Sequence, residues 1–235
     1  GKSTNTGNIT IGSATTIAGP ITVYGGDLAI NAALTATSSD INLHASGAVT
    51  QTAAVTADKL GLHGTGTFTL TNTSNNVATI AGGDATTKLG SLDFVDTADG
   101  LTIGTVNPTG ISSTGPITIK TLSGDLTITE PIVSTLSTGD AVKLYADKDV
   151  TVGNAGDGNI KITDNGSVTV ESGSRALLYS GKESESTGVQ TEVGGESNTR
   201  TSVDATTDLS AVDPVLSATG KYGLFRMENM NDNAN

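Results

Sequence analysis

Three aspartates in the middle of the chain have the side chain that glycan-cleaving enzymes use. Asp93, Asp96 and Asp99 recur at intervals of three around Phe94 and Val95. Hydrolases and lyases need two or three carboxylates gathered at one site. Because side chains alternate between the two faces of a strand, this spacing does not place all three carboxylates on one face. We interpret them as solvated residues at strand corners.

A second acidic group, formed by Asp140, Asp147 and Asp149, accompanies Lys143 and Lys148. This set predicts a cluster of carboxylates and ammonium groups, but exposed charges of this kind make weak ion pairs. The sequence shows no nucleophile elbow and no Gly-rich stretch before a helix, which serine hydrolases and phosphate-binding loops require. We therefore predict no catalytic residue, no cofactor-binding residue, no cofactor and no enzymatic activity.

The chain has two histidines, His44 and His63, nineteen residues apart. If nineteen residues make one coil of a repeating fold, the two rings stack about 4.8 Å apart. The chain has no cysteine, and no third ligand lies in frame with the histidines. Zinc sites need three or four protein ligands, so we interpret the pair as a polar surface ladder rather than a metal site.

Oxygen-bearing side chains in the segment 153–159 raise the possibility of a calcium site. Asn154, Asp157 and Asn159 are the candidate ligands. The segment lacks both the twelve-residue loop of helix-loop-helix calcium proteins and the Gly-Gly-x-Gly-x-Asp nonapeptide. Turn chemistry explains these residues without an ion, and no metal site is predicted.

A run of alternating threonines would suit an ice-binding surface if it recurred in every coil. The threonines are Thr65, Thr67, Thr69, Thr71 and Thr73, and alternation would place them on one face of a strand. The Thr-x-Thr pair does not recur regularly along the chain. We therefore interpret these residues as strand formers on a soluble face.

The composition favours a thin core of small aliphatic side chains. The 235 residues are 35% hydrophobic but only 3% aromatic, with 40 Thr and 30 Gly. The net charge of -12 argues against nucleic acid as a partner, because binding phosphates requires clustered Lys and Arg. The absence of cysteine agrees with an exported bacterial protein. No signal peptide, membrane insertion or membrane span is predicted, since no apolar stretch reaches 18 residues.

Short alternating segments from residue 8 to residue 179 predict β-strands throughout this region. Each segment places two aliphatic residues on one face and a polar residue or glycine on the other. Examples are Ile9-Thr10-Ile11, Ile21-Thr22-Val23, Leu28-Ala29-Ile30, Phe68-Thr69-Leu70, Ile117-Thr118-Ile119, Leu126-Thr127-Ile128 and Val168-Thr169-Val170.

The strands repeat at two scales, which favours a solenoid. Segments 19–30 and 115–128 share the pattern Gly-Pro-Ile-Thr-Val/Ile followed by Gly-Asp-Leu-x-Ile, at an offset of 96 to 98 residues. The shorter repeat relates 41–44 to 60–63 at an offset of nineteen. We predict an all-β fold, a parallel β-helix in which equivalent side chains stack from coil to coil.

An antiparallel β-sandwich is the alternative fold. Its two-residue hairpin turns would correspond to Asp99-Gly100, Asp157-Gly158 and Asn165-Gly166. In the β-helix interpretation, residues 1–181 form the repeat shaft and 182–219 a polar linker or loop. Residues 220–228 then form a C-terminal capping strand, and 229–235 a disordered tail.

Several segments carry a resemblance to a known family. They are the Gly-Asp-Leu-x-Ile frames, FTLTNTSNNVATIA at 68–81, LTIGTV at 101–106, and a closing block of SRALLYSG at 174–181, STG at 186–188 and YGLFR at 222–226. This pattern resembles the repeats of filamentous-haemagglutinin-like giant adhesins of Gram-negative bacteria. The resemblance implies a right-handed parallel β-helix, exported by two-partner secretion through an outer-membrane pore.

The expected function follows from this resemblance. It is that of a non-enzymatic segment of a secreted adhesin or filament at the bacterial cell surface, an elongated scaffold for attachment or biofilm. The expected partners are a surface glycan or protein of host or bacterium, and an outer-membrane secretion partner for a longer chain in which this segment lies along the shaft. End-to-end self-association into an extracellular filament is the alternative, and a polysaccharide-degrading enzyme is a third interpretation.

Overall fold

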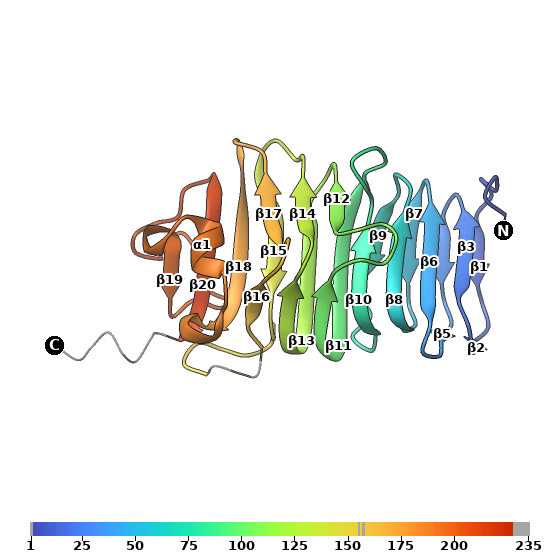
Figure 1. Ribbon diagram of the computed structural model, residues 1–235, viewed down its shortest axis with the longest axis horizontal. Helices are drawn as coiled ribbons and strands as arrows, with labels where there is room; N and C mark the ends of the chain where they lie inside the picture. Colours follow the sequence, from blue (N-terminus) through green and yellow to red (C-terminus); the bar gives the residue numbers. More distant parts are fainter. Residues whose placement is uncertain (1, 155, 157, 228–235) are drawn as a thin grey trace.

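The computed structural model describes residues 2–154, 156 and 158–227. The molecule is elongated, and its strands lie side by side along the long axis, with the N-terminal and C-terminal strands at opposite ends (Figure 1). The tail expected at 229–235 lies outside the described residues, as does residue 228.

The described residues form twenty strands and three short helices. The first ten strands are β1 (Ile9–Ile11), β2 (Thr15–Ile17), β3 (Ile21–Gly25), β4 (Leu28–Ile30), β5 (Leu34–Ala36), β6 (Asp40–Ala45), β7 (Ala48–Gln51), β8 (Val55–His63), β9 (Thr67–Leu70) and β10 (Asn76–Gly82). The next eight strands are β11 (Ser91–Ile103), β12 (Ile111–Ser113), β13 (Ile117–Ile128), β14 (Pro131–Ser134), β15 (Gly139–Tyr145), β16 (Ile160–Ile162), β17 (Ser167–Val170) and β18 (Ser174–Lys182). The C-terminal elements are the 3-10 helix η1 (Glu183–Glu185), α1 (Val189–Val193), the 3-10 helix η2 (Glu196–Asn198), β19 (Thr199–Thr201) and β20 (Gly220–Met227).

The strands pair in parallel from coil to coil, which confirms the β-helix and excludes the antiparallel sandwich. One side of the solenoid, side A, stacks β1, β4, β7, β9, the start of β11, the start of β13, β15, β18 and β20. A second side, side B, stacks β3, β6, the end of β8, the end of β10, the end of β11, the end of β13 and β16. Two shorter stacks complete the coils. One contains β2, β5 and the start of β8, and the other contains β12, β14 and β17. Among the described residues, the one antiparallel bridge joins Thr105 to Thr109 and is isolated.

Aliphatic side chains stack in columns inside the coil, and these columns form one continuous core. The side A column is Ile9, Leu28, Val49, Phe68, Leu92, Ile117, Val142 and Ala176. The side B column is Ile21, Ile41, Leu60, Ile80, Ile103, Ile128 and Ile162. Burying one such side chain fully contributes about 1.5–3 kcal/mol, so the core gains stability in similar increments along the axis.

The two sequence repeats differ in structural meaning. The nineteen-residue offset marks one coil, because Ile41 pairs with Leu60 and His44 with His63. The longer offset does not mark a whole number of coils. Ile21 belongs to the side B column, whereas Ile117, its counterpart in the longer repeat, belongs to the side A column. The repeated unit is therefore two strands joined by a corner, and its two copies lie at different positions around the coil.

A buried asparagine fixes one corner across three neighbouring coils. The Oδ1 atom of Asn75 accepts hydrogen bonds from the backbone N–H of Val55 and the side chain of Gln51, each at 2.9 Å. Its Nδ2 atom donates to the carbonyls of Leu70 at 3.1 Å and Val95 at 3.0 Å. The side chain thereby satisfies backbone groups that the corner removes from the strand ladder.

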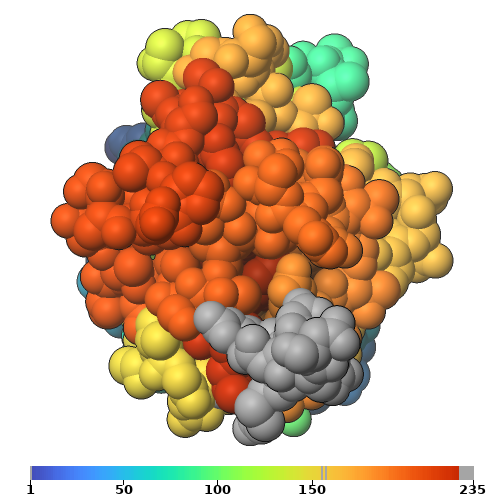
Figure 2. Space-filling view, turned by 90° about the vertical axis from the view of Figure 1, so that its left-hand side faces the viewer, coloured from blue at the N-terminus to red at the C-terminus, as the bar shows by residue number. Residues whose placement is uncertain are grey.

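The segment 182–219, expected as a polar linker or loop, folds over the C-terminal end of the core. Helix α1 places Val189 and Val193 in the main core with 0% and 3% exposure. Gly188 begins the helix with a φ of 76°, and a Cβ there would lie 2.5 Å from the carbonyl oxygen of Ile162. Only glycine accommodates both the left-handed backbone and this close approach. Figure 2 shows this end of the molecule, with the C-terminal segment spread across it.

The final strand, β20, adds a last rung to side A by pairing with β18, and it also pairs with β19. Outside the solenoid wall, residues 203–216 cover these strands and create a second hydrophobic cluster. Its buried members are Leu177, Tyr179, Val203, Leu216, Tyr222 and Leu224. Within the part of the chain that the structure describes, no helix reaches the length and apolar character needed to cross a membrane.

The corner asparagine gives a stability prediction. Replacing Asn75 with alanine leaves the Val55 N–H and the Leu70 and Val95 carbonyls buried without their partner. We expect Asn75→Ala to lower the free energy of unfolding by about 3 kcal/mol, measured by urea denaturation. Asn31→Ala, at an exposed position, is the matched control and should change it by less than about 0.5 kcal/mol. Equal effects of the two variants would contradict this role.

Candidate functional site

The three aspartates around Phe94 lie in different environments. Asp93 points outward and pairs with Lys120 at 3.2 Å, while Asp99 lies exposed at a register shift of β11. Asp96 departs from the expected solvated corner, because it is fully buried. Its carboxylate accepts hydrogen bonds from the N–H groups of Val77 and Ala98, each at 2.9 Å. Asp96 thus accepts backbone hydrogen bonds at the corner next to the one that Asn75 fixes.

The second acidic group is also dispersed. Asp140 pairs with Arg175 at 2.5 Å, and Lys148 pairs with the adjacent Asp149. Asp147 is buried, and its main chain lies under Arg226, which donates to the carbonyls of residues 146, 147 and 158 at 2.7, 3.3 and 3.1 Å. Of the expected cluster, Lys148 and Asp149 form an ion pair, whereas Asp140 pairs instead with Arg175 on the neighbouring strand β18.

The two histidines stack on the outer surface of side B, as predicted. Their ring centroids lie 4.0 Å apart with an angle of 7° between the planes. Tyr24, which was not predicted to belong to this stack, extends it beyond His44 with a centroid distance of 4.2 Å. In parallel stacked rings the nitrogen lone pairs run side by side and do not converge on one ion. No group of three or more potential metal ligands occurs among the described residues.

Burial lowers the pKa of both histidines. For His63 the burial and the neighbouring His44 lower the pKa to about 4, against the opposing effects of Asp84 and of a hydrogen bond to the backbone of Asn107. His63 Nε2 also lies 3.2 Å from Oδ1 of Asn42. The ladder is therefore uncharged at neutral pH, which allows the rings to stack without repulsion.

The described residues of the candidate calcium segment make hydrogen bonds within the protein. Asn154 accepts a hydrogen bond from the N–H of Gly156 at 3.0 Å. The side chain of Asn159 accepts from the Lys182 N–H at 2.8 Å and donates to Glu185 at 3.3 Å. Asp157 lies outside the described residues. The oxygen atom of Asn159 that a cation would need is already used within the protein.

The five alternating threonines do not share one strand. Strand β9 ends at Leu70, so Thr67 and Thr69 lie within it, while Thr65 precedes it and Thr71 and Thr73 follow it. Thr69 is in register with Thr50 on one side and Asp93 on the other. This sequence does not fold into the flat threonine array that an ice-binding face requires.

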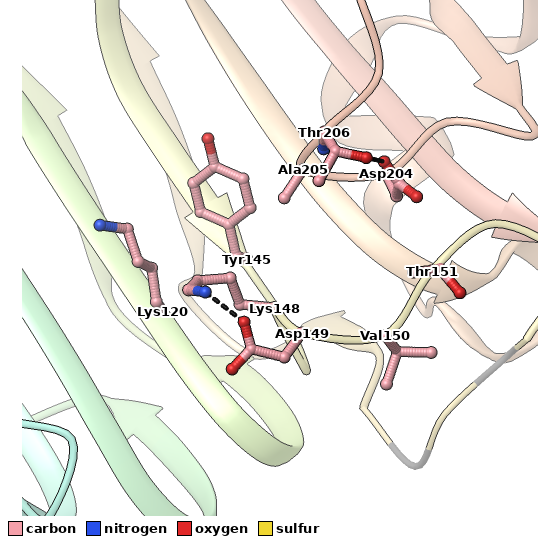
Figure 3. A pocket seen from close by; sticks show the side chains of 9 residues that line it. All are labelled: Lys120, Tyr145, Lys148, Asp149, Val150, Thr151, Asp204, Ala205 and Thr206. Carbon is pink, nitrogen blue, oxygen red and sulfur yellow. Dashed lines mark hydrogen bonds and ion pairs between the residues drawn. The ribbon is translucent and has the colours of Figure 1, made fainter.

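A cavity of 320 Å³ lies on the outer surface of side A, where the C-terminal cover meets the shaft. Its lining comes from Lys120 of β13, Tyr145 of β15, the loop 148–151 and the loop 204–206. Figure 3 shows Lys120 and Tyr145 projecting from neighbouring strands, with Asp204 and Thr206 across from them. This site was not predicted from the sequence, because its two walls, within 120–151 and at 204–206, are distant from each other in the chain.

Asp204 holds the far wall of the cavity in place. Its carboxylate accepts hydrogen bonds from the Thr206 N–H at 2.8 Å, the Thr206 hydroxyl at 2.7 Å and the Val152 N–H at 2.9 Å. Burial alone would raise the pKa of Asp204, but these bonds and one from Thr207 outweigh it and lower the pKa to about 2. An ionised Asp204 thereby joins the loop 204–206 to the loop 148–152.

Tyr145 forms the aromatic part of the cavity. One face of its ring stacks on Tyr179, with a centroid distance of 4.4 Å and an interplanar angle of 9°. Burial first, and the negative charge of Asp140 second, raise the pKa of Tyr145. Its phenol therefore stays protonated and can both donate and accept a hydrogen bond.

The chain has no significant match among family models, curated proteins or solved structures. Its functional assignment therefore rests on its own residues and their arrangement.

Two buried ionisable groups give opposite dependences of stability on pH. Burial raises the pKa of Asp96 to about 7, so between about pH 4 and 7 the folded state binds the extra proton and stability falls as pH rises. The pKa of His63 is lowered to about 4, so over about pH 4 to 6.5 the unfolded state binds the extra proton and stability rises with pH. We expect the two effects to oppose one another in the parent protein.

Single variants should separate the two effects. Relative to the parent, Asp96→Asn should lose stability on acidification from about pH 6.5 to 4.5, and His63→Gln should gain it. Urea midpoints measured across this range check both signs. Midpoint curves that run parallel to that of the parent for both variants would show that neither group titrates as described.

Proposed function

We propose that this chain is a non-enzymatic segment of a secreted bacterial surface adhesin, an elongated scaffold for attachment or biofilm. The observation that carries the proposal is the unbroken parallel ladder over a single aliphatic core, closed at one end by a folded cap. Every coil hydrogen-bonds to its neighbours, so the shaft is stiff and can be lengthened by adding coils. Such a fold suits a protein that holds a surface at a distance from the cell.

The distribution of carboxylates supports a non-enzymatic role. Glycan cleavage requires an acid and a second carboxylate within reach of one sugar bond. Asp93, Asp140 and Asp149 pair with cations, Asp96 and Asp147 are buried, and Asp204 accepts hydrogen bonds from Val152 and Thr206. Each of the paired or hydrogen-bonded carboxylates thus already has a partner within the protein.

The cap argues against the alternative of an end-to-end filament. A filament of identical chains needs an open core at both ends. At the C-terminal end of the described core, Val189 and Val193 fill the coil. This end therefore offers no open core to a second chain.

Export and cell-surface localisation belong to the proposal through the family resemblance. The closing block at 174–181, 186–188 and 222–226, which resembles the end of adhesin repeat arrays, lies in β18, just before α1, and in β20. The absence of cysteine and the net charge of -12 suit a soluble extracellular protein. The proposed partners are a surface glycan or protein and, for a longer chain, an outer-membrane secretion partner.

The proposal predicts attachment without catalysis. Beads coated with the purified chain should adhere to host-cell monolayers or bacterial biofilm more than beads coated with heat-unfolded chain. Incubation of the chain with neutral and acidic polysaccharides should release no reducing ends. Release that is abolished by Asp140→Ala or Asp149→Ala would instead establish an enzyme, and adhesion equal to that of the unfolded control would contradict the adhesin function.

A further inference from the structure

The ring of Tyr145 lines the cavity, and Tyr179 stacks on one of its two faces. Stacked rings along a solenoid lie with their planes across the axis, so each ring presents one face to the coil before it and one to the coil after it. Tyr179 covers the later face of Tyr145. The residue in register on the earlier side is Lys120, whose ammonium group pairs with Asp93 at 3.2 Å. Lys120 and the part of the Tyr145 ring that Tyr179 leaves uncovered line the cavity together.

The polar groups around this ring include both donors and acceptors. Lys120 and Lys148 are donors, Asp149 and Asp204 are acceptors, and Thr151 and Thr206 carry hydroxyl groups. Both ammonium groups are already paired with carboxylates, Lys120 with Asp93 and Lys148 with Asp149. The cavity thus has no excess positive charge for an acidic ligand, and its mixed polar rim suits a neutral ligand with several hydroxyl groups.

The walls of the cavity are held in place before any ligand binds. Asp204 joins the two loops by its hydrogen bonds to Val152 and Thr206, and Tyr179 fixes the ring of Tyr145 from behind. A preformed site avoids the cost of ordering loops and side chains on binding. The volume of 320 Å³ lies at the lower end of the range for small-molecule sites, about 300–1,000 Å³, which suits a ligand of about one ring.

We propose that this cavity binds one neutral pyranose unit of a surface glycan, with the apolar face of the sugar on the uncovered part of the Tyr145 ring and its hydroxyl groups on the surrounding lysine, aspartate and threonine side chains. This assignment rests on the proposed adhesin function and names its ligand. A larger groove of 780 Å³ runs between the loops at 84–88 and 105–109. Its lining contains no aromatic side chain, so it offers no comparable surface for a sugar ring.

The test is titration of the isotope-labelled full chain with single sugars, followed by NMR. The probes are the methyl pyranosides of glucose, galactose and mannose, N-acetylglucosamine, and glucuronic acid as the acidic comparison. We expect saturable shifts near Tyr145 and Thr206 with at least one neutral sugar, and weaker binding of glucuronic acid. Tyr145→Ala should weaken binding by about tenfold or more, and Tyr145→Phe by less than about threefold, because the ring face is kept.

Tyr24→Ala is the matched control, since Tyr24 belongs to the other outer stack, on side B, and lines a separate cavity of about 340 Å³ together with His44. It should leave sugar binding unchanged. Absence of saturable binding by every neutral sugar, equal binding by Tyr145→Ala, or preference for glucuronic acid would overturn the proposal. The folded state of each variant is checked by its amide spectrum, and Tyr145→Leu, which keeps apolar volume without a ring, replaces Tyr145→Ala if that variant unfolds.

The outcome can be separated from that of the adhesin function. Bead attachment is measured in parallel, with the free sugar as competitor. Attachment without sugar binding would overturn the cavity assignment and leave the adhesin function in place. Sugar binding without attachment would support the cavity assignment and contradict the adhesin function.

Discussion

The parallel hydrogen-bond ladder between coils is the constraint on which the rest of this structure depends. It holds equivalent residues in register, so one inward aliphatic residue stacks on the next, as Leu28, Val49 and Phe68 do on side A. The same register stacks outward residues, which produces the ladders Tyr24–His44–His63 and Tyr145–Tyr179. Corners interrupt the ladder, and buried side chains such as Asn75 and Asp96 supply the hydrogen bonds that the backbone loses there.

The C-terminal end of this ladder is covered by the chain itself. The cap buries Val189 and Val193 against the last coils, while the segment that continues from it folds back over the outside of β18 and β20. This covering segment ends beside Tyr145. The cavity lies where the covered part of the shaft meets the uncovered part. The proposed ligand site is thus a consequence of how the array is closed rather than of the repeats themselves.

The sequence predicted the repeating part of this fold and little of the site. Alternation, the nineteen-residue offset and turn residues predicted the parallel β-helix and the stacking of His44 on His63, because these depend on local pattern and register. The cap was expected as a polar linker, because a five-residue helix with only Val189 and Val193 buried has too little periodicity to recognise. The roles of Asp96 and Asp204 and the cavity at Tyr145 depend on contacts between distant segments, which no local pattern contains.

The most direct test of the central claim, a stiff shaft closed at its C-terminal end, is small-angle scattering at several concentrations. The parent chain should give a rod-like monomer at every concentration. Val189→Asp, which places a charge in the capped core end, should remain elongated but associate as concentration rises, whereas Gln190→Asp on the exposed side of α1 should behave as the parent. A compact parent particle, or growth of the parent and both variants alike, would contradict the account.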